Sequence, residues 1–287
     1  MDTPEQPLIE PTPSPEPARF GEREAGAKFA PTAVDPAPGQ PVDASFPPWT
    51  VWDVLAVAGA TFAAVFLCSI LALGVAHLLT AGRNISVGAL ATNPVVVIGA
   101  QVVAYPLVIL FMVTVVGARS REGFWRAIRW NWNAAKAPAF FLGGMLVAFV
   151  VDYGSKYLPL PKSVPLENYF HEALGAYVTT VFGITLGPLL EELFFRGLLY
   201  PRMRRLVGVV PAILFTAVVF ASIHAPQLGF AWGPLLSIFV VGVVFTLVRE
   251  KSGSVAATFT MHVGYNLLLF GMLWVTTDHF RHLEKVT

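Results

Sequence analysis

The chain has 287 residues, of which 55% are hydrophobic and 13% charged, and its formal net charge is +1. Soluble domains are about 45–50% apolar and about 25% charged, so this composition excludes an ordinary soluble domain and favours a membrane protein. A net charge this small supplies no field that attracts nucleic acid, so we expect no nucleic-acid partner. The single cysteine, Cys68, excludes an intramolecular disulfide framework and a cysteine-based metal cluster.

The first 48 residues form a proline-rich, acidic tail. They contain 12 of the 23 prolines and eight acidic residues against three basic ones. Such a segment buries too little apolar surface to order itself, so we predict a disordered tail over residues 1–48. The tail lacks the basic start and apolar core of a signal peptide.

Seven apolar runs follow, each of a length that suits a membrane span at helical rise. The fold class predicted from them is all-α, a polytopic transmembrane helical bundle of about seven spans. The predicted spans are residues 51–79, 94–117, 137–154, 176–200, 208–225, 232–249 and 254–276.

The basic residues between these runs predict the topology. The loops after the second, fourth and sixth spans carry ten Lys and Arg residues, whereas the alternate loops carry three. Cytoplasmic loops hold the excess of positive charge, so the N-terminal tail is predicted to be cytoplasmic and the C-terminus external. The ten residues are Arg119, Arg121, Arg126, Arg129, Lys136, Arg202, Arg204, Arg205, Arg249 and Lys251, and the three are Arg83, Lys156 and Lys162.

Between the second and third spans, "REGFWRAIRWNWN" has the pattern of an amphipathic helix. Its helical periodicity places Phe124, Trp125, Ile128 and Trp132 on one face. Such a face, with tryptophans among the apolar residues, is typical of a helix that lies in the membrane interface. We therefore predict an interfacial helix near residues 121–133; a lid over an entrance is the alternative.

Three of the predicted spans contain ionisable or amide side chains. An ionisable group at the bilayer centre costs at least about 2.5–3.5 kcal/mol, so its presence indicates a function. The groups are Glu191, Glu192 and Arg196 in the fourth span, His224 at the end of the fifth, and His262 and Asn266 in the seventh.

Helical spacing separates the roles of the two glutamates. Glu192 and Arg196 are four residues apart on one face and can neutralise each other. Glu191 is rotated by about 100° from Glu192 and lacks that partner. Counted from the turn between the fourth and fifth spans, Glu191 and His224 lie at nearly the same depth, close to the membrane midplane. This depth leaves open the leaflet toward which a site would face.

The residues "EELFFR" (191–196), "FASIH" (220–224) and "HVGYN" (262–266) resemble the motifs EExxxR, FxxxH and HxxxN. These motifs belong to the type II CAAX prenyl endopeptidase and bacteriocin-processing (CPBP) family of intramembrane glutamic endopeptidases. The resemblance implies a catalytic transmembrane core over residues 175–276. The N-terminal transmembrane helices over 49–174 and the short tail over 277–287 lie outside the resemblance, and the helices are predicted from composition and hydropathy.

The resemblance also implies a set of site residues, without cofactor or metal. They are catalytic Glu191, His224, His262 and Asn266, and supporting Glu192 and Arg196. A dry pocket disfavours a charged carboxylate, so Glu191 could take a proton from a water and return it to the leaving amine. His224 would hold that water, and Asn266 would donate to the developing oxyanion.

The expected function is therefore hydrolysis of peptide bonds within or at the bilayer. The expected partners are the lipid bilayer and a peptide or protein substrate, lipid-modified or otherwise membrane-associated. Residue usage rich in Ala, Pro, Val and Arg, with no targeting signal, favours a bacterial plasma membrane.

Two other function classes remain open. One glutamate with two histidines is a plausible zinc ligand set, although no HExxH pair is present. An ion-coupled transporter or a non-catalytic scaffold could use the same residues as a proton relay. The first half of the chain has no second cluster of the kind that an inverted repeat would supply.

Overall fold

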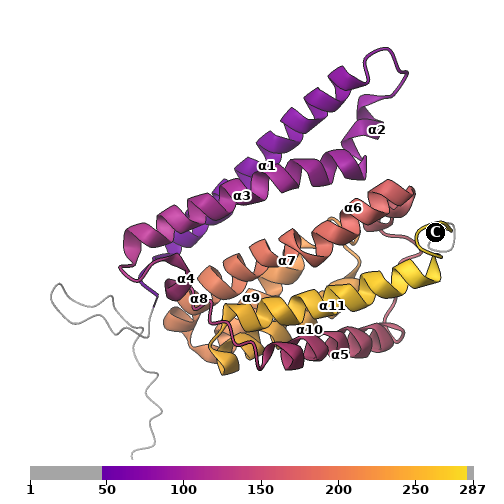
Figure 1. The fold of residues 1–287 in the computed structure, drawn as a ribbon. Helices are drawn as coiled ribbons and strands as arrows, with labels where there is room; N and C mark the ends of the chain where they lie inside the picture. Colours follow the sequence, from indigo (N-terminus) through magenta and orange to yellow (C-terminus); the bar gives the residue numbers. More distant parts are fainter. Residues whose placement is uncertain (1–46, 283–287) are drawn as a thin grey trace, which may run out of the picture. The chain divides into compact units, whose positions relative to one another are not determined.

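The computed structural model describes residues 47–282, and every regular element in this range is helical (Figure 1). Within residues 47–282, six helical segments are long and apolar enough to cross a membrane, and a further apolar helix is shorter. The predicted all-α, membrane-type bundle is confirmed. The proline-rich tail lies outside the described residues, apart from its last two prolines, and the described part of the C-terminal tail ends at His282.

The predicted spans correspond to observed helices with limits that differ by a few residues, except that the fourth is divided. In chain order the elements are α1 (Val51–Leu79), α2 (Val87–Ala91), α3 (Pro94–Arg119), α4 (Phe124–Ala127), α5 (Ala137–Ser155), the 3-10 helix η1 (Pro165–Phe170), α6 (Ala173–Ile184), α7 (Leu186–Glu191), the π-helix η2 (Glu192–Leu199), α8 (Tyr200–Val207), α9 (Val209–Ile223), α10 (Trp232–Ser252) and α11 (Val255–Thr276).

Helices α1 and α3 lie side by side (Figure 1). Thr50 and Asp53 form a capping box that starts α1, which satisfies backbone donors that the first turn leaves free. Asp53 also accepts from Arg119 at 3.1 Å, so an ion pair joins the start of α1 to the end of α3.

Helices α5 and α11 pack along one another at unusually short range. Gly144 of α5 lies against the backbone of Met261, and Gly264 of α11 lies against the backbone of Phe141. A Cβ atom at either glycine would overlap those backbone atoms. Small residues allow helices in membranes to approach closely. Helix α5 therefore fixes the position of the helix that carries the HxxxN motif.

The fourth predicted span falls within Ala173–Val207, a candidate membrane span, but this stretch is not one continuous helix. Helix α6 ends at Ile184, and Thr185 adopts a non-helical conformation (φ −115°, ψ −85°) before α7 begins. The cause is Pro188, which has no N–H to donate to the carbonyl of Ile184 and whose ring crowds the preceding turn. The break thus lies at Thr185, three residues before Pro188.

After α7 the chain widens into the π-helix η2, which the sequence did not predict. Two carbonyl groups of this segment accept hydrogen bonds from outside it. Arg249 Nε donates to the Arg196 carbonyl at 3.0 Å, and Trp49 Nε1 donates to the Leu198 carbonyl at 3.0 Å. Single π-turns inside α-helices occur frequently at functional sites.

An amphipathic helix was expected near residues 121–133. The observed helix α4 has a single turn, so the predicted length is wrong. Arg129 adopts a left-handed conformation (φ 62°), which ends the helix. Phe124 and Ile128 are buried in the core against Leu193 and Leu198. Part of the apolar face therefore packs inside the protein. The location of the segment 121–133 at the membrane interface stays a prediction.

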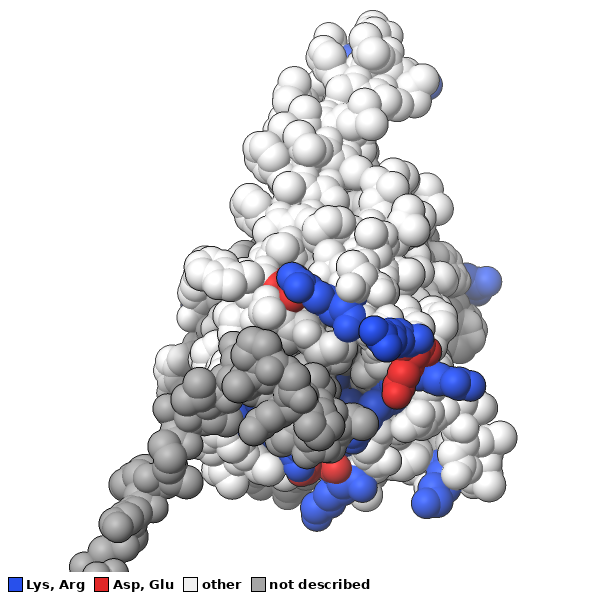
Figure 2. Space-filling model, turned by 90° about the vertical axis from the view of Figure 1, so that its left-hand side faces the viewer, with Lys and Arg blue, Asp and Glu red and all other residues white. Residues whose placement is uncertain are grey.

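Lys and Arg side chains gather at the end of the bundle that holds α4 and α8 (Figure 2). Glu250 is bound within this group, since its carboxylate accepts from Arg204 at 3.0 Å and from the Tyr200 hydroxyl at 2.7 Å. We call this end the arginine-rich end. Its assignment to the cytoplasm remains the prediction made from the loop charges.

Candidate active site

The glutamate pair sits at the junction of α7 and η2, where the helix widens. Glu192 and Arg196 are both fully buried, and Arg196 NH1 lies 2.9 Å from Glu192 Oε1. The same oxygen lies 2.9 Å from His262 Nδ1. The four-residue spacing therefore produces the expected ion pair, and the pair also holds an imidazole of α11.

Arg196 is enclosed by partners from other elements. Its NH2 group donates to the Gly242 carbonyl of α10 at 3.2 Å. Its guanidinium carbon lies 4.5 Å from the ring centre of Phe220 and 5.5 Å from that of Phe245. A buried charge requires such pairing and hydrogen bonding to be tolerated, so this cation belongs to the frame of the site.

Glu191 faces the two histidines. Its Oε1 lies 3.9 Å from His224 Nε2, and its Oε2 lies 3.8 Å from His262 Nε2. These separations are too long for direct hydrogen bonds but suit a bridging water. The Glu191 side chain is 22% exposed, whereas that of Glu192 is completely buried. The structure thus brings together side chains from the three motifs and distinguishes the two glutamates.

Hydrogen bonds at the far side of each imidazole ring fix which nitrogen faces Glu191. His224 Nδ1 lies 2.8 Å from the Phe220 carbonyl, which can only accept, so this nitrogen carries hydrogen. His262 Nδ1 donates in the same way to the Glu192 carboxylate. In the neutral rings both Nε2 atoms are then acceptors directed at the same space beside Glu191.

Asn266 lies one turn beyond His262 on α11. Its Nδ2 donates to the Gly183 carbonyl at 2.6 Å, which fixes the amide and leaves a second N–H. Asn266 contributes to the cavity that Glu191 and both histidines line. All four residues expected to be catalytic therefore border one cavity.

This cavity has a volume of about 400 Å³ and runs away from the arginine-rich end. Helix α11 begins beside Arg129, whose carbonyl accepts from Val255 N, and the cavity continues to Leu273, one turn before the helix ends. Glu167 of η1 and Gln227 line the same region. Leu166 N donates to the Gln227 carbonyl at 3.0 Å, which ties η1 to the turn after α9.

The sequence interpretation missed polar residues of α3 near the site. Gln101 lines the cavity, and the Tyr105 hydroxyl donates to its Oε1 at 3.1 Å. The Tyr105 ring also packs against Phe182 at 5.2 Å between centres. The signal was present, because Gln101 and Tyr105 are four residues apart in an otherwise apolar run, as His262 and Asn266 are.

A metal ion would need at least three well-placed ligands from His, Cys, Asp or Glu. Within residues 47–282 no group of three or more such residues has a geometry that could hold one. The imidazole nitrogen of His262 nearest Glu192 already donates to a carboxylate shared with Arg196.

Residues 173–268 match the family model described as type II CAAX prenyl endopeptidase Rce1-like. No curated protein and no solved structure matches the chain. The matched range runs from α6 into α11 and contains all three motifs. Together with the bundle of membrane-type helices, the match supports a membrane protease. Residues 173–268 of this chain are thus similar to the Rce1-like type II CAAX prenyl endopeptidase family.

Proposed function

We propose that the protein is an intramembrane endopeptidase in which Glu191 activates a water molecule for attack on a peptide bond. One observation carries the proposal: Glu191 and the Nε2 atoms of His224 and His262 border one cavity at 3.8–3.9 Å separations. A water between them lies within reach of a base and of a second acceptor that orients it.

The hydrogen-bond inventory supports distinct roles for the three groups. A water has two hydrogens, whereas the carboxylate and two neutral imidazoles offer three acceptors. In our proposal the water donates to Glu191 and to His224, which leaves its lone pair directed at the scissile carbonyl. The free N–H of Asn266 donates to the oxyanion, and His262 lies beside the scissile carbonyl.

The proposed reaction conserves protons. The water oxygen bonds to the carbonyl carbon while Glu191 takes the proton. Glu191 then gives that proton to the amide nitrogen as the C–N bond breaks, which releases an amine and a carboxylic acid. Glu192 and Arg196 stay outside these steps; in this proposal they orient His262 through its Nδ1, as an outer partner orients a catalytic imidazole.

The cavity also favours one side for substrate entry. It extends from Glu191 toward Gln227 and η1, away from the arginine-rich end. If the arginine-rich end is cytoplasmic, as the loop charges predict, then the cavity opens to the external side. We propose a bacterial plasma-membrane enzyme with a cytoplasmic N-terminus that takes peptide or protein segments, lipid-modified or membrane-associated, from that side.

The test is cleavage by the full chain in proteoliposomes. Wild type, Glu191→Gln and His224→Ala would each be incubated with a library of apolar peptides, and products would be identified by mass spectrometry. The proposal expects cleavage by wild type and loss in both variants at unchanged expression and thermal stability. Undiminished turnover in either variant contradicts it, and proton-coupled solute uptake without any peptide product favours the transporter.

A further inference from the structure

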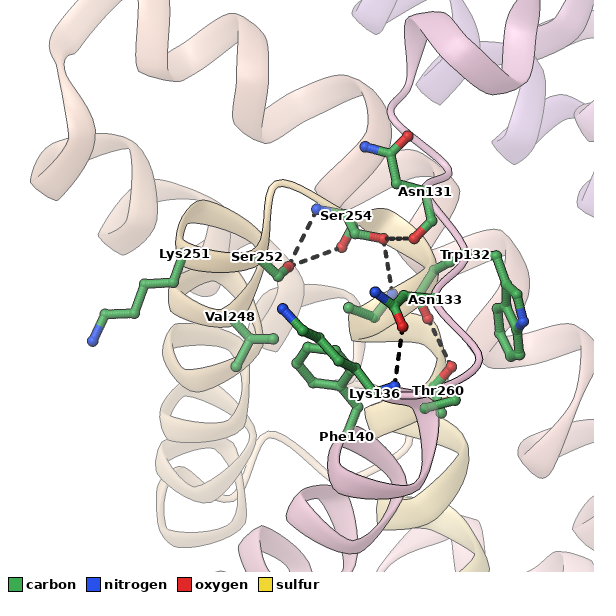
Figure 3. A pocket seen from close by; sticks show the side chains of 13 residues that line it. Asn131, Trp132, Asn133, Lys136, Phe140, Val248, Lys251, Ser252, Ser254 and Thr260 are labelled. Atoms are coloured by element: carbon green, nitrogen blue, oxygen red, sulfur yellow. Dashed lines mark hydrogen bonds between the residues drawn. The ribbon is translucent and has the colours of Figure 1, made fainter.

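A second cavity lies at the opposite end of α11 from η1, between the starts of α5 and α11 and the end of α10 (Figure 3). Its volume is about 570 Å³. It shares no lining residue with the cavity around Glu191, so it is a separate feature. Its wall is formed by residues of the segments 131–140 and 248–260.

The ionisable side chains of this wall are two lysines, Lys136 and Lys251, and no Asp or Glu lines it. Lys136 reaches across the opening toward Ser252 and Val248, whereas Lys251 extends along the outer side of α10 (Figure 3). Within the described residues no carboxylate forms an ion pair with either ammonium group. Glu250, next to Lys251, is bound to Arg204 and Tyr200.

Two helix N-termini add to this positive field. Helix α5 starts after Lys136 with no side-chain cap, and α11 starts after Ser254. The first turn of a helix presents backbone N–H groups and the positive end of its dipole. Lys136 across the opening, Lys251 at its outer edge and the two helix starts therefore all add positive potential at this end of α10, which favours a negatively charged ligand.

The position of the cavity indicates which kind of anion it could bind. Helices α5, α10 and α11 are all candidate membrane spans, and each begins or ends at this cavity. Its opening thus lies where hydrocarbon meets headgroups, and exposed Trp132 flanks it as interfacial tryptophans do. Phe140, Val248 and Ala257 supply an apolar wall for the deeper part. A ligand with an anionic head and an apolar tail matches both parts.

We propose that this cavity binds the phosphate headgroup of an anionic phospholipid, with Lys136 and Lys251 as its cationic contacts and the apolar wall against its acyl chains. Basic pockets between transmembrane helices recognise such headgroups by the same chemistry. The bound lipid joins α10 to α5 and to α11, and so stabilises the helix that carries His262.

The test measures lipid binding by the full chain, independently of proteolysis. Protein in neutral detergent micelles is titrated with phosphatidylglycerol, and the apparent affinity is read from the rise in Tm and from native mass spectrometry. Lys136→Gln/Lys251→Gln should weaken the affinity roughly thirty-fold, since each lysine near an anionic surface contributes about five-fold. Lys156→Gln/Lys162→Gln, which changes two lysines at the other end of the bundle, should leave it unchanged.

Three results would overturn the proposal. They are equal affinity in the Lys136/Lys251 variant and wild type, an equal loss in the two double variants, and an equal rise in Tm with phosphatidylcholine. Inorganic phosphate at matched concentration separates the two sources of the anion: a rise in Tm equal to that with phosphatidylglycerol identifies a free phosphate site and refutes the lipid. Lys136→Arg/Lys251→Arg should retain binding, because it keeps both charges.

Discussion

The same Glu→Gln substitution at the two adjacent glutamates should distinguish a catalytic role from a structural one. Glu191→Gln and Glu192→Gln each replace a carboxylate with an amide of nearly the same shape, one residue apart. We expect Glu191→Gln to abolish most activity and leave stability intact, because this side chain faces the cavity and its nearest imidazole nitrogens are 3.8–3.9 Å away. We expect Glu192→Gln to impair folding and activity together.

The magnitudes follow from burial. Glu192 and Arg196 are fully buried at 2.9 Å, and removal of one partner of a buried pair costs about 3–5 kcal/mol. At roughly 2–4 °C per kcal/mol for a domain of this size, Glu192→Gln should lower Tm by roughly 6–20 °C. Glu191→Gln should shift Tm by at most about 2 °C, and loss of a general base should reduce kcat by about 10²–10⁴-fold.

The assay pairs thermal unfolding in detergent with turnover of one peptide substrate in proteoliposomes. Activity is compared at a temperature where each variant remains folded, so that the two effects stay separate. A large drop in Tm for Glu191→Gln together with a stable, inactive Glu192→Gln would refute the assignment, because it would exchange the roles of the two carboxylates.

Three further predictions concern packing, metal and topology. Gly264→Ala should destabilise the fold by about 1–3 kcal/mol through overpacking, and so lower both Tm and activity. Gly271→Ala is the control, because a Cβ atom there meets no atom within 4 Å, and it should lower neither. Equal Tm values for the two variants would contradict the close α5–α11 contact. Turnover should persist after removal of divalent metal with a strong chelator, and activity restored only by Zn²⁺ would establish the zinc alternative. In a Cys68→Ala background, a membrane-impermeant maleimide should label Gln227→Cys in intact cells and Arg121→Cys only after permeabilisation. Labelling of Arg121→Cys in intact cells, with Gln227→Cys labelled only after permeabilisation, would place the cavity mouth in the cytoplasm.

The sequence predicted those features that depend on the local spacing of residues and on the hydrocarbon layer of the membrane. Apolar runs of span length gave the helices, because a hydrocarbon layer leaves few alternatives for the backbone. The four-residue interval gave the Glu192–Arg196 ion pair, and matched depth placed Glu191 beside His224. The catalytic roles of these residues remain predictions for the experiments above.

The features that it missed depend on contacts between distant segments. The π-helix is accompanied by hydrogen bonds from Arg249 and Trp49, which no local pattern specifies. The residues 121–133 show a helical period, yet Ile128 is buried beside Gly197 and the chain turns at Arg129. Tertiary packing overrode the periodicity in that segment, whereas the break before α7 was signalled locally by Pro188.

The central claim is that a single water joins Glu191 to His224 inside the bundle. An experimental density map of the protein in a lipid nanodisc, at a resolution that shows ordered water, tests it most directly. The account predicts one water within about 3 Å of a Glu191 carboxylate oxygen and of His224 Nε2. A Glu191 carboxylate packed against lipid chains, or separated from both imidazoles by protein side chains, would contradict it.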